Sequence, residues 1–240
     1  ERESYGTIYF PISYLLLAIL FWDYSNHITI AFFILAIADP FASIIGEIVK
    51  RKISFNILGD NKTLQGSIAM FICSLIIILT LSNQFFNHWE ITYKLMAAII
   101  ISFAVTIAEA LSYKGSDNLS IPITAFLFIE LLHHLNRNQI VFQYIISILI
   151  IILILYGTYL RRYLSISGLI GATIMAIFLL GFGGDGYLYP LVTFFITSSI
   201  LTLVRKENIN KNSSNRNITQ VYANGGVALF ICIANYFQPN

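Results

Sequence analysis

The sequence predicts an all-α, polytopic integral membrane protein, and three observations lead to that fold class. Of the 240 residues, 57% are hydrophobic and only 11% are charged, whereas a soluble chain carries about 25% charged residues. The apolar residues fall into discrete runs, several of which reach the roughly 20 residues that a membrane-crossing helix requires. The basic residues gather in alternate loops, and this bias sets the orientation of membrane proteins.

About nine apolar runs are expected to form transmembrane helices. In chain order they are Ile8–Trp22, Ile28–Val49, Ile68–Leu81, Leu95–Leu111, Ile121–Leu132, Ile140–Leu160, Ile166–Phe182, Tyr187–Val204 and Val221–Phe237. Tyr144–Tyr159 is apolar all round, so it lacks the polar face of a helix on a soluble protein. Short runs such as Ile121–Leu132 need flanking residues to complete a crossing.

The loops indicate which side is cytoplasmic. When nine segments are threaded alternately, every basic residue except Lys94 and Arg137 falls on one side. That side is expected to be cytoplasmic, in what we take to be a bacterial inner membrane. The polar stretch Arg205–Gln220 is expected to be a flexible cytoplasmic linker. Because the opening Glu1-Arg2-Glu3 has no signal-peptide layout and no soluble tail follows Tyr236, the chain is expected to be a fragment.

Asp39 is the first candidate for chemistry, since it lies near the middle of an apolar segment. A carboxylate in that position is costly unless it meets a partner or water, so it marks a functional site. Pro40 is expected to kink the helix and free backbone carbonyls nearby. The residues that share the helix face of Asp39 are Ala42, Ser43, Gly46 and Lys50. A helix-packing face with a buried, neutral Asp39 is the structural alternative.

Two cytoplasmic segments supply the remaining candidates. Gly59–Ser67 is a basic, glycine-containing loop before a helix, which suits phosphate because backbone N–H groups, the helix dipole and Lys62 all favour anions. The segment Glu109–Pro122 brings acids and an amide to the same face, and such oxygen ligands suit Mg²⁺. Each alone is also explained by an orienting loop or an ordinary turn. Together they provide what phosphoryl transfer needs, namely charge neutralisation, metal ligands and positioning.

These motifs resemble the CTP-binding signatures of the dolichol kinase and phytol kinase family, which is related to the phosphatidate cytidylyltransferases. The first signature is Asp39-x-x-Ala42-x-x-x-Gly46, followed by Asn61-Lys62-Thr63-Leu64-x-Gly66-Ser67. The second is Glu109-Ala110 with Asp117-Asn118-Leu119-x-x-Pro122. The resemblance covers roughly Gly6–Leu132. This chain departs from the family where Lys50 replaces a frequent glycine and Gln65 a frequent glutamate.

The resemblance implies CTP-dependent phosphorylation of a long-chain isoprenoid alcohol of the phytol, dolichol or farnesol type. CTP would be the phosphate donor, Mg²⁺ or a similar divalent cation the cofactor, and the alcohol would come from the bilayer. Asp39, Asp117 and Lys62 are expected to be catalytic. Asp39, Asp117 and Asn118 would bind the metal. Ser43, Gly46, Lys62, Thr63 and Gly66 would contact the nucleotide, with Glu109 in support. No nucleic-acid polymer is expected as a partner.

Residues 1–139 are therefore expected to form a lipid-alcohol kinase-like domain that lacks its N-terminal helices. Residues 140–240 are expected to form a second, truncated membrane domain. That domain resembles the integral membrane family that includes plant phytyl-phosphate kinases, through Ser167–Ala172, Phe194–Ser199 and Arg216–Gly226. Three alternatives stay open for the protein: a cytidylyltransferase that makes a CDP-lipid, a transporter with its binding site at Asp39 and Pro40, and a non-catalytic scaffold.

Overall fold

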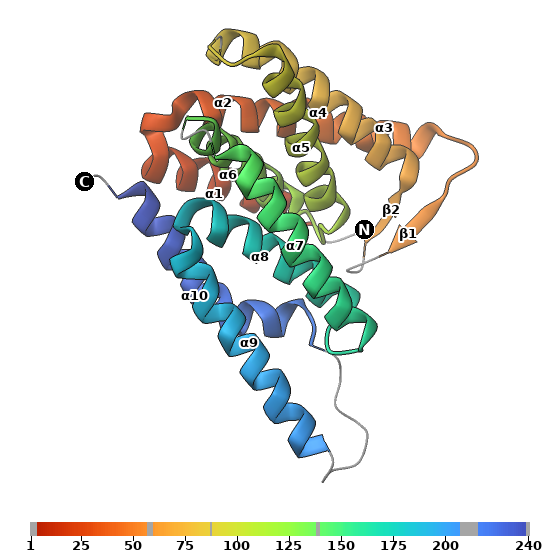
Figure 1. Ribbon diagram of the computed structural model, residues 1–240. Helices are drawn as coiled ribbons and strands as arrows, with labels where there is room; N and C mark the ends of the chain where they lie inside the picture. The colour runs from red at the N-terminus through yellow and green to blue at the C-terminus, as the bar shows by residue number, and fades with distance from the viewer. Residues whose placement is uncertain (1–3, 57–59, 87, 138–139, 207–215, 239–240) are drawn as a thin grey trace. The chain divides into compact units, whose positions relative to one another are not determined.

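The fold was analysed in a computed structural model, which describes residues 4–56, 60–86, 88–137, 140–206 and 216–238. It divides into two compact units, Glu1–Leu132 (unit 1) and His133–Asn240 (unit 2). Apart from one small hairpin, the regular structure of the described residues is helical, as the sequence predicts (Figure 1).

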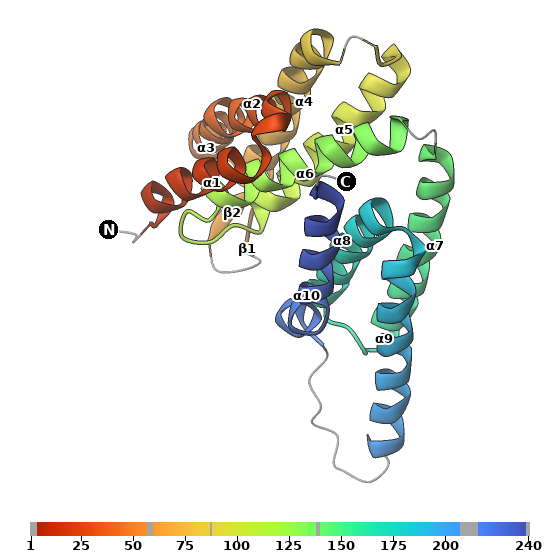
Figure 2. The ribbon, with the colours of Figure 1, turned by 90° about the vertical axis from the view of Figure 1, so that its left-hand side faces the viewer.

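Unit 1 opens with two helical segments that fold back on each other. Helix α1 spans Gly6–Phe21, and a 3₁₀ turn (η1, Trp22–Tyr24) leads into α2, Ser25–Phe33. Phe32 of α2 contacts both Phe10 and Tyr14 of α1 edge-on, so the two helices pack antiparallel. A π-helical segment (η2, Ile34–Ala38) continues directly into α3, Asp39–Ile48. Figure 2 shows α1 beside α2.

A hairpin and three long helices complete unit 1. Strands β1 (Ser54–Asn56) and β2 (Asn61–Thr63) pair antiparallel, with Phe55 opposite Lys62. The helices are α4 (Leu64–Phe85), α5 (Ile91–Ala110) and α6 (Asp117–Arg137), the last turn of α6 being counted with unit 2. Helix α6 therefore extends the predicted run Ile121–Leu132 with flanking residues, as expected for a run too short to cross a membrane by itself. Helix α4 packs along both α3 and α5.

Unit 2 contains four helices: α7 (Val141–Leu160), α8 (Ile166–Gly183), α9 (Asp185–Lys206) and α10 (Ile218–Phe237). Helix α10 packs along α8, and Gly171 lies where a Cβ atom would meet Ile218. Ser165 caps α8 by accepting the N–H of Gly168, and Asn217 and Gln220 form a capping box at the start of α10. Of the expected linker Arg205–Gln220, residues 207–215 lie outside the described residues.

Seven helical stretches of the described chain are long and apolar enough to cross a membrane. The first, Gly6–Ile48, contains both α1 and the α2–α3 segment. These stretches support an α-helical integral membrane protein. They do not establish nine crossings.

Candidate functional site

Charged side chains from four separate segments meet at one end of unit 1. The Lys62 ammonium nitrogen lies 2.6 Å from a Glu109 carboxylate oxygen and 3.6 Å from a carboxylate oxygen of Asp117. Asp39 is close enough to interact electrostatically with all three. We call Asp39, Lys62, Glu109 and Asp117 the polar cluster. The structure therefore brings together the charged residues that the sequence singled out.

Lys62 is positioned by the junction between the hairpin and α4. It is the middle residue of β2, and the next residue, Thr63, is the N-cap of α4. The Thr63 hydroxyl oxygen accepts the backbone N–H of Gly66 at 3.1 Å, which satisfies one of the unpaired donors in the first helical turn. Lys62 thus stands directly before a helix N-terminus, where the helix dipole favours anions.

Neighbouring carboxylates keep the Lys62 side chain protonated. Only 17% of its side chain is exposed. Burial alone would lower the pKa of the Lys62 ammonium group, but the Glu109 carboxylate, with Asp117 and Asp39, raises it above its ordinary value of 10.5. The ammonium group is therefore charged at neutral pH, with the Glu109 and Asp117 carboxylates in contact with it and the Asp39 carboxylate nearby.

Asp39 follows an irregular turn of its helix. The π-helical segment Ile34–Ala38 ends immediately before it, and Pro40 occupies the first turn of α3. Proline is tolerated there, because an N–H in the first turn has no partner within the helix. The irregularity expected from Pro40 therefore lies just before Asp39. Such π-turns are frequent at functional sites.

Asp117 and Asn118 begin α6 after a tight loop. One Asp117 carboxylate oxygen accepts the Asn118 backbone N–H at 3.0 Å, and the other accepts the hydroxyl of buried Ser112 at 3.2 Å. The Asn118 amide donates to the carbonyl of Gly115, which has φ of +85°. A Cβ atom on Gly115 would lie 2.6 Å from the backbone nitrogen of Gly6. A glycine at this position therefore leaves room for the start of α1.

Gly46 and Gly66 lie where α3 and α4 cross closely. A Cβ atom on Gly46 would lie 2.7 Å from the Thr63 hydroxyl oxygen, and one on Gly66 would lie 2.9 Å from the Ala42 carbonyl oxygen. Helix packing therefore requires both glycines, and their contact with a nucleotide stays a prediction. Ser43 is exposed, and no contact between its side chain and the polar cluster is found in the described residues.

Three residues of the site surroundings were not predicted as contributors. Ser112 orients Asp117, as described above. Asp60 accepts the backbone N–H of Lys114 at 2.7 Å and so ties the hairpin to the loop before α6. The Gln65 amide donates to the carbonyl of Arg51 and accepts the N–H of Ile53. A carboxylate cannot donate a hydrogen bond to the Arg51 carbonyl, which explains why glutamine and not glutamate stands at position 65. These hydrogen bonds could not be predicted from the sequence, because each depends on how the loops bring the two partners together.

Comparison with known proteins bears on unit 2. A family model described as "Integral membrane protein DUF92" matches residues 149–239, from α7 to the end of α10. No curated protein and no solved structure matches the chain. The family match and the apolar helices show an integral membrane protein. The resemblance expected over the second half is thereby supported at the level of this membrane family.

Proposed function

We propose that unit 1 transfers the γ-phosphate of CTP to the hydroxyl group of a long-chain isoprenoid alcohol at the cytoplasmic membrane face. The observation that carries this proposal is the polar cluster. A lysine whose side chain is only 17% exposed stands directly before a helix N-terminus, in contact with the Glu109 and Asp117 carboxylates and near Asp39. Phosphoryl transfer needs little covalent chemistry from a protein, but it needs charge stabilisation and positioning of both reactants.

The donor set fits a divalent cation. Three carboxylates around one ammonium group leave an excess of negative charge, and bringing a polyphosphate there requires more positive charge. Asp39 and Asp117 would hold Mg²⁺, which typically takes one or two carboxylates and completes its shell with water and substrate phosphates. Bound there, the cation would neutralise charge on the phosphates of CTP.

The side chains of the chain have distinct roles in this proposal. Lys62 contacts the transferring phosphate as a point charge, and the N–H groups at the start of α4 contact its oxygens. Ser112 holds the Asp117 carboxylate in one orientation, while Glu109 holds the Lys62 ammonium group. The bond between the alcohol oxygen and the γ-phosphorus forms as the β–γ phosphoanhydride bond breaks. The alcohol proton passes to a carboxylate, for which we assign Asp117, and CDP leaves.

Labelled CTP tests this proposal directly. The full chain is placed in lipid vesicles with Mg²⁺ and a panel of isoprenoid alcohols, and the lipids are then extracted. Label entering the lipid from the γ-position supports the kinase. Label entering from the α-position shows a cytidylyltransferase instead. Absence of both overturns the proposal.

A transporter is the second candidate, and the π-helical segment before Asp39 favours it. Broken transmembrane helices with an acid at the break are typical of ion and substrate sites in transporters. In that case the protein in sealed vesicles would carry a solute across the membrane without consuming CTP. The position of Lys62, directly before the Thr63-capped N-terminus of α4, is better explained by phosphate binding, so we place the kinase first.

A further inference from the structure

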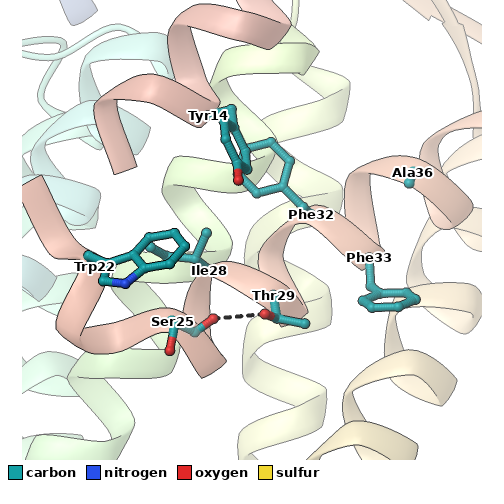
Figure 3. Close-up of a pocket in the computed structure, with 8 residues that line it drawn as sticks. All are labelled: Tyr14, Trp22, Ser25, Ile28, Thr29, Phe32, Phe33 and Ala36. Atoms are coloured by element: carbon teal, nitrogen blue, oxygen red, sulfur yellow. Dashed lines mark hydrogen bonds between the residues drawn. The ribbon is translucent and has the colours of Figure 1, made fainter. Parts of the chain in front are cut away.

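An apolar groove runs between α1 and α2 on the outer surface of unit 1 (Figure 3). It has a volume of about 340 Å³, within the usual range for small-molecule sites. Its lining includes Tyr14 and Trp22 on one side and Thr29, Phe32 and Ala36 on the other. The rings of Tyr14 and Phe32 meet edge-to-face at 5.3 Å, which is a preferred aromatic geometry.

Both walls of the groove lead to the polar cluster. The lining residues of the second wall extend from Ser25 to Ala36, about 16 Å along a helix axis at 1.5 Å per residue. Asp39 follows Ala36 by three residues, or about 4.5 Å, without a break in the helical segment. The other wall, α1, begins at Gly6, where an added Cβ atom would lie 2.8 Å from the Asn118 amide. The groove therefore ends about one helical turn from Asp39, along the same helical segment.

The surroundings of Asp39 limit what can occupy the groove. Asp39 shares the polar cluster with Lys62, Glu109 and Asp117. A neutral hydroxyl group is placed beside these carboxylates at a lower cost than a charged head group. The groove walls carry no charged residue, and Tyr14 and Trp22 are 45% and 63% exposed. These features fit a single apolar chain with a terminal hydroxyl group.

We propose that this α1–α2 groove binds the apolar chain of the acceptor alcohol and directs its hydroxyl group toward Asp39. The inference rests on the proposed function and adds the route by which the alcohol reaches the cluster. It also predicts selection against anionic two-chain phospholipids, whose charged head groups would be repelled by the carboxylates of the polar cluster. Substrate choice would then depend on chain shape along α2 more than on the polar cluster.

Filling the far part of the groove tests the inference. Thr29→Trp places a large ring among the lining residues, whereas Ile19→Trp on α1 adds the same ring at a site that is 75% exposed and outside the groove. With Thr29→Trp, we expect kcat/KM to fall at least about tenfold for long alcohols, since roughly two methylene groups lose their burial. Short alcohols, which do not reach Thr29, keep normal values, and Ile19→Trp changes neither.

A binding measurement gives an independent readout. A long alcohol with a photoreactive diazirine in its tail is cross-linked to the full chain in nanodiscs, and the labelled peptides are mapped. We expect labelling of peptides that contain Trp22–Phe33, reduced by unlabelled alcohol and by Thr29→Trp. If the unmodified protein phosphorylates alcohols but Thr29→Trp keeps the same chain-length profile, the groove is wrong and the kinase stands. If the unmodified protein phosphorylates no alcohol, the proposed function fails and the groove assignment with it.

Discussion

Replacing Lys62 by alanine is the sharpest test of the polar cluster. Lys62 is the one basic residue of the hairpin region whose ammonium group contacts Glu109 and Asp117 among the described residues. Arg51, eleven residues earlier, has an exposed side chain and contributes its backbone carbonyl to Gln65. Both residues would contribute to a positive-inside bias. Of the two, Lys62 contacts the acids of the polar cluster, where the proposed function requires a charge beside the phosphate.

The expected effect follows from the distances. A unit charge about 4 Å from another, near a protein surface with an effective dielectric constant of about 20, interacts with roughly 4 kcal/mol. Desolvation and side-chain ordering reduce that figure, and loss of a comparable transition-state donor costs about 100- to 1000-fold in rate. We therefore expect Lys62→Ala to lower kcat/KM for CTP by about 100- to 1000-fold. Arg51→Ala should change it by less than about threefold, because exposed charges contribute little.

The assay is steady-state kinetics against CTP, with insertion and thermal unfolding measured in parallel. The parallel measurement matters because Lys62→Ala leaves the buried Glu109 without its cation and so also lowers stability. Both variants are therefore compared at a temperature at which each is folded. Full activity of Lys62→Ala at low CTP concentration would show that this loop only orients the chain, and the kinase proposal would lose its main support.

Three further perturbations test separate parts of the site. Asp39→Asn should lower the rate of phosphorylation at least about 100-fold while the protein still inserts into the membrane. Near-normal activity would show that Asp39 has a structural role instead. Gly46→Ala should lower the unfolding free energy by about 1 kcal/mol by displacing the α4 cap, whereas the matched Gly157→Ala, in open space, should raise it by about 0.5–1 kcal/mol; equal shifts in thermal unfolding would contradict the close crossing. Glu109 raises the pKa of Lys62 above 10.5, so the stability it provides is present below pH 10.5 and is lost as pH rises through the higher folded-state value. Denaturant unfolding followed from neutral to alkaline pH should therefore show a gap between the unmodified protein and Glu109→Gln that narrows as Lys62 loses its proton, and a gap that stays constant over this range would refute this origin.

The helical framework could be predicted because hydrophobicity alone determines it. The run Ile140–Leu160 corresponds to α7 within one residue, and Ile166–Phe182 corresponds to α8. The hairpin of β1 and β2 was not predicted, since three-residue strands leave no periodic pattern. Neither was the π-turn before Asp39, because a single wide turn leaves the hydrophobicity of the segment unchanged.

The charged members of the site could be predicted for a different reason. A carboxylate within an apolar helix is conspicuous whatever the tertiary structure, and Lys62 and Asp117 were identified by their motifs. The pairing of Lys62 with Glu109 could not be predicted, since it joins residues 47 positions apart and depends on how the hairpin meets the end of α5. Ser112 is buried as a partner of Asp117, and a lone serine at a helix end carries no such signal.

The close crossing of α3 and α4 determines which substitutions report on phosphate chemistry. Gly66 has the Ala42 carbonyl and the Thr63 hydroxyl oxygen beside it, so a side chain there would disturb helix packing before it met a nucleotide. Loss of activity in Gly66→Val would therefore not distinguish a nucleotide contact at this position from a role in helix packing. Thr63 is more informative, since its hydroxyl oxygen accepts the Gly66 N–H and its hydrogen can still be donated to a phosphate oxygen. Thr63→Asn keeps an acceptor for the cap but moves the donor. If it folds normally and uses CTP poorly, the hydroxyl group contacts the nucleotide as well as capping α4.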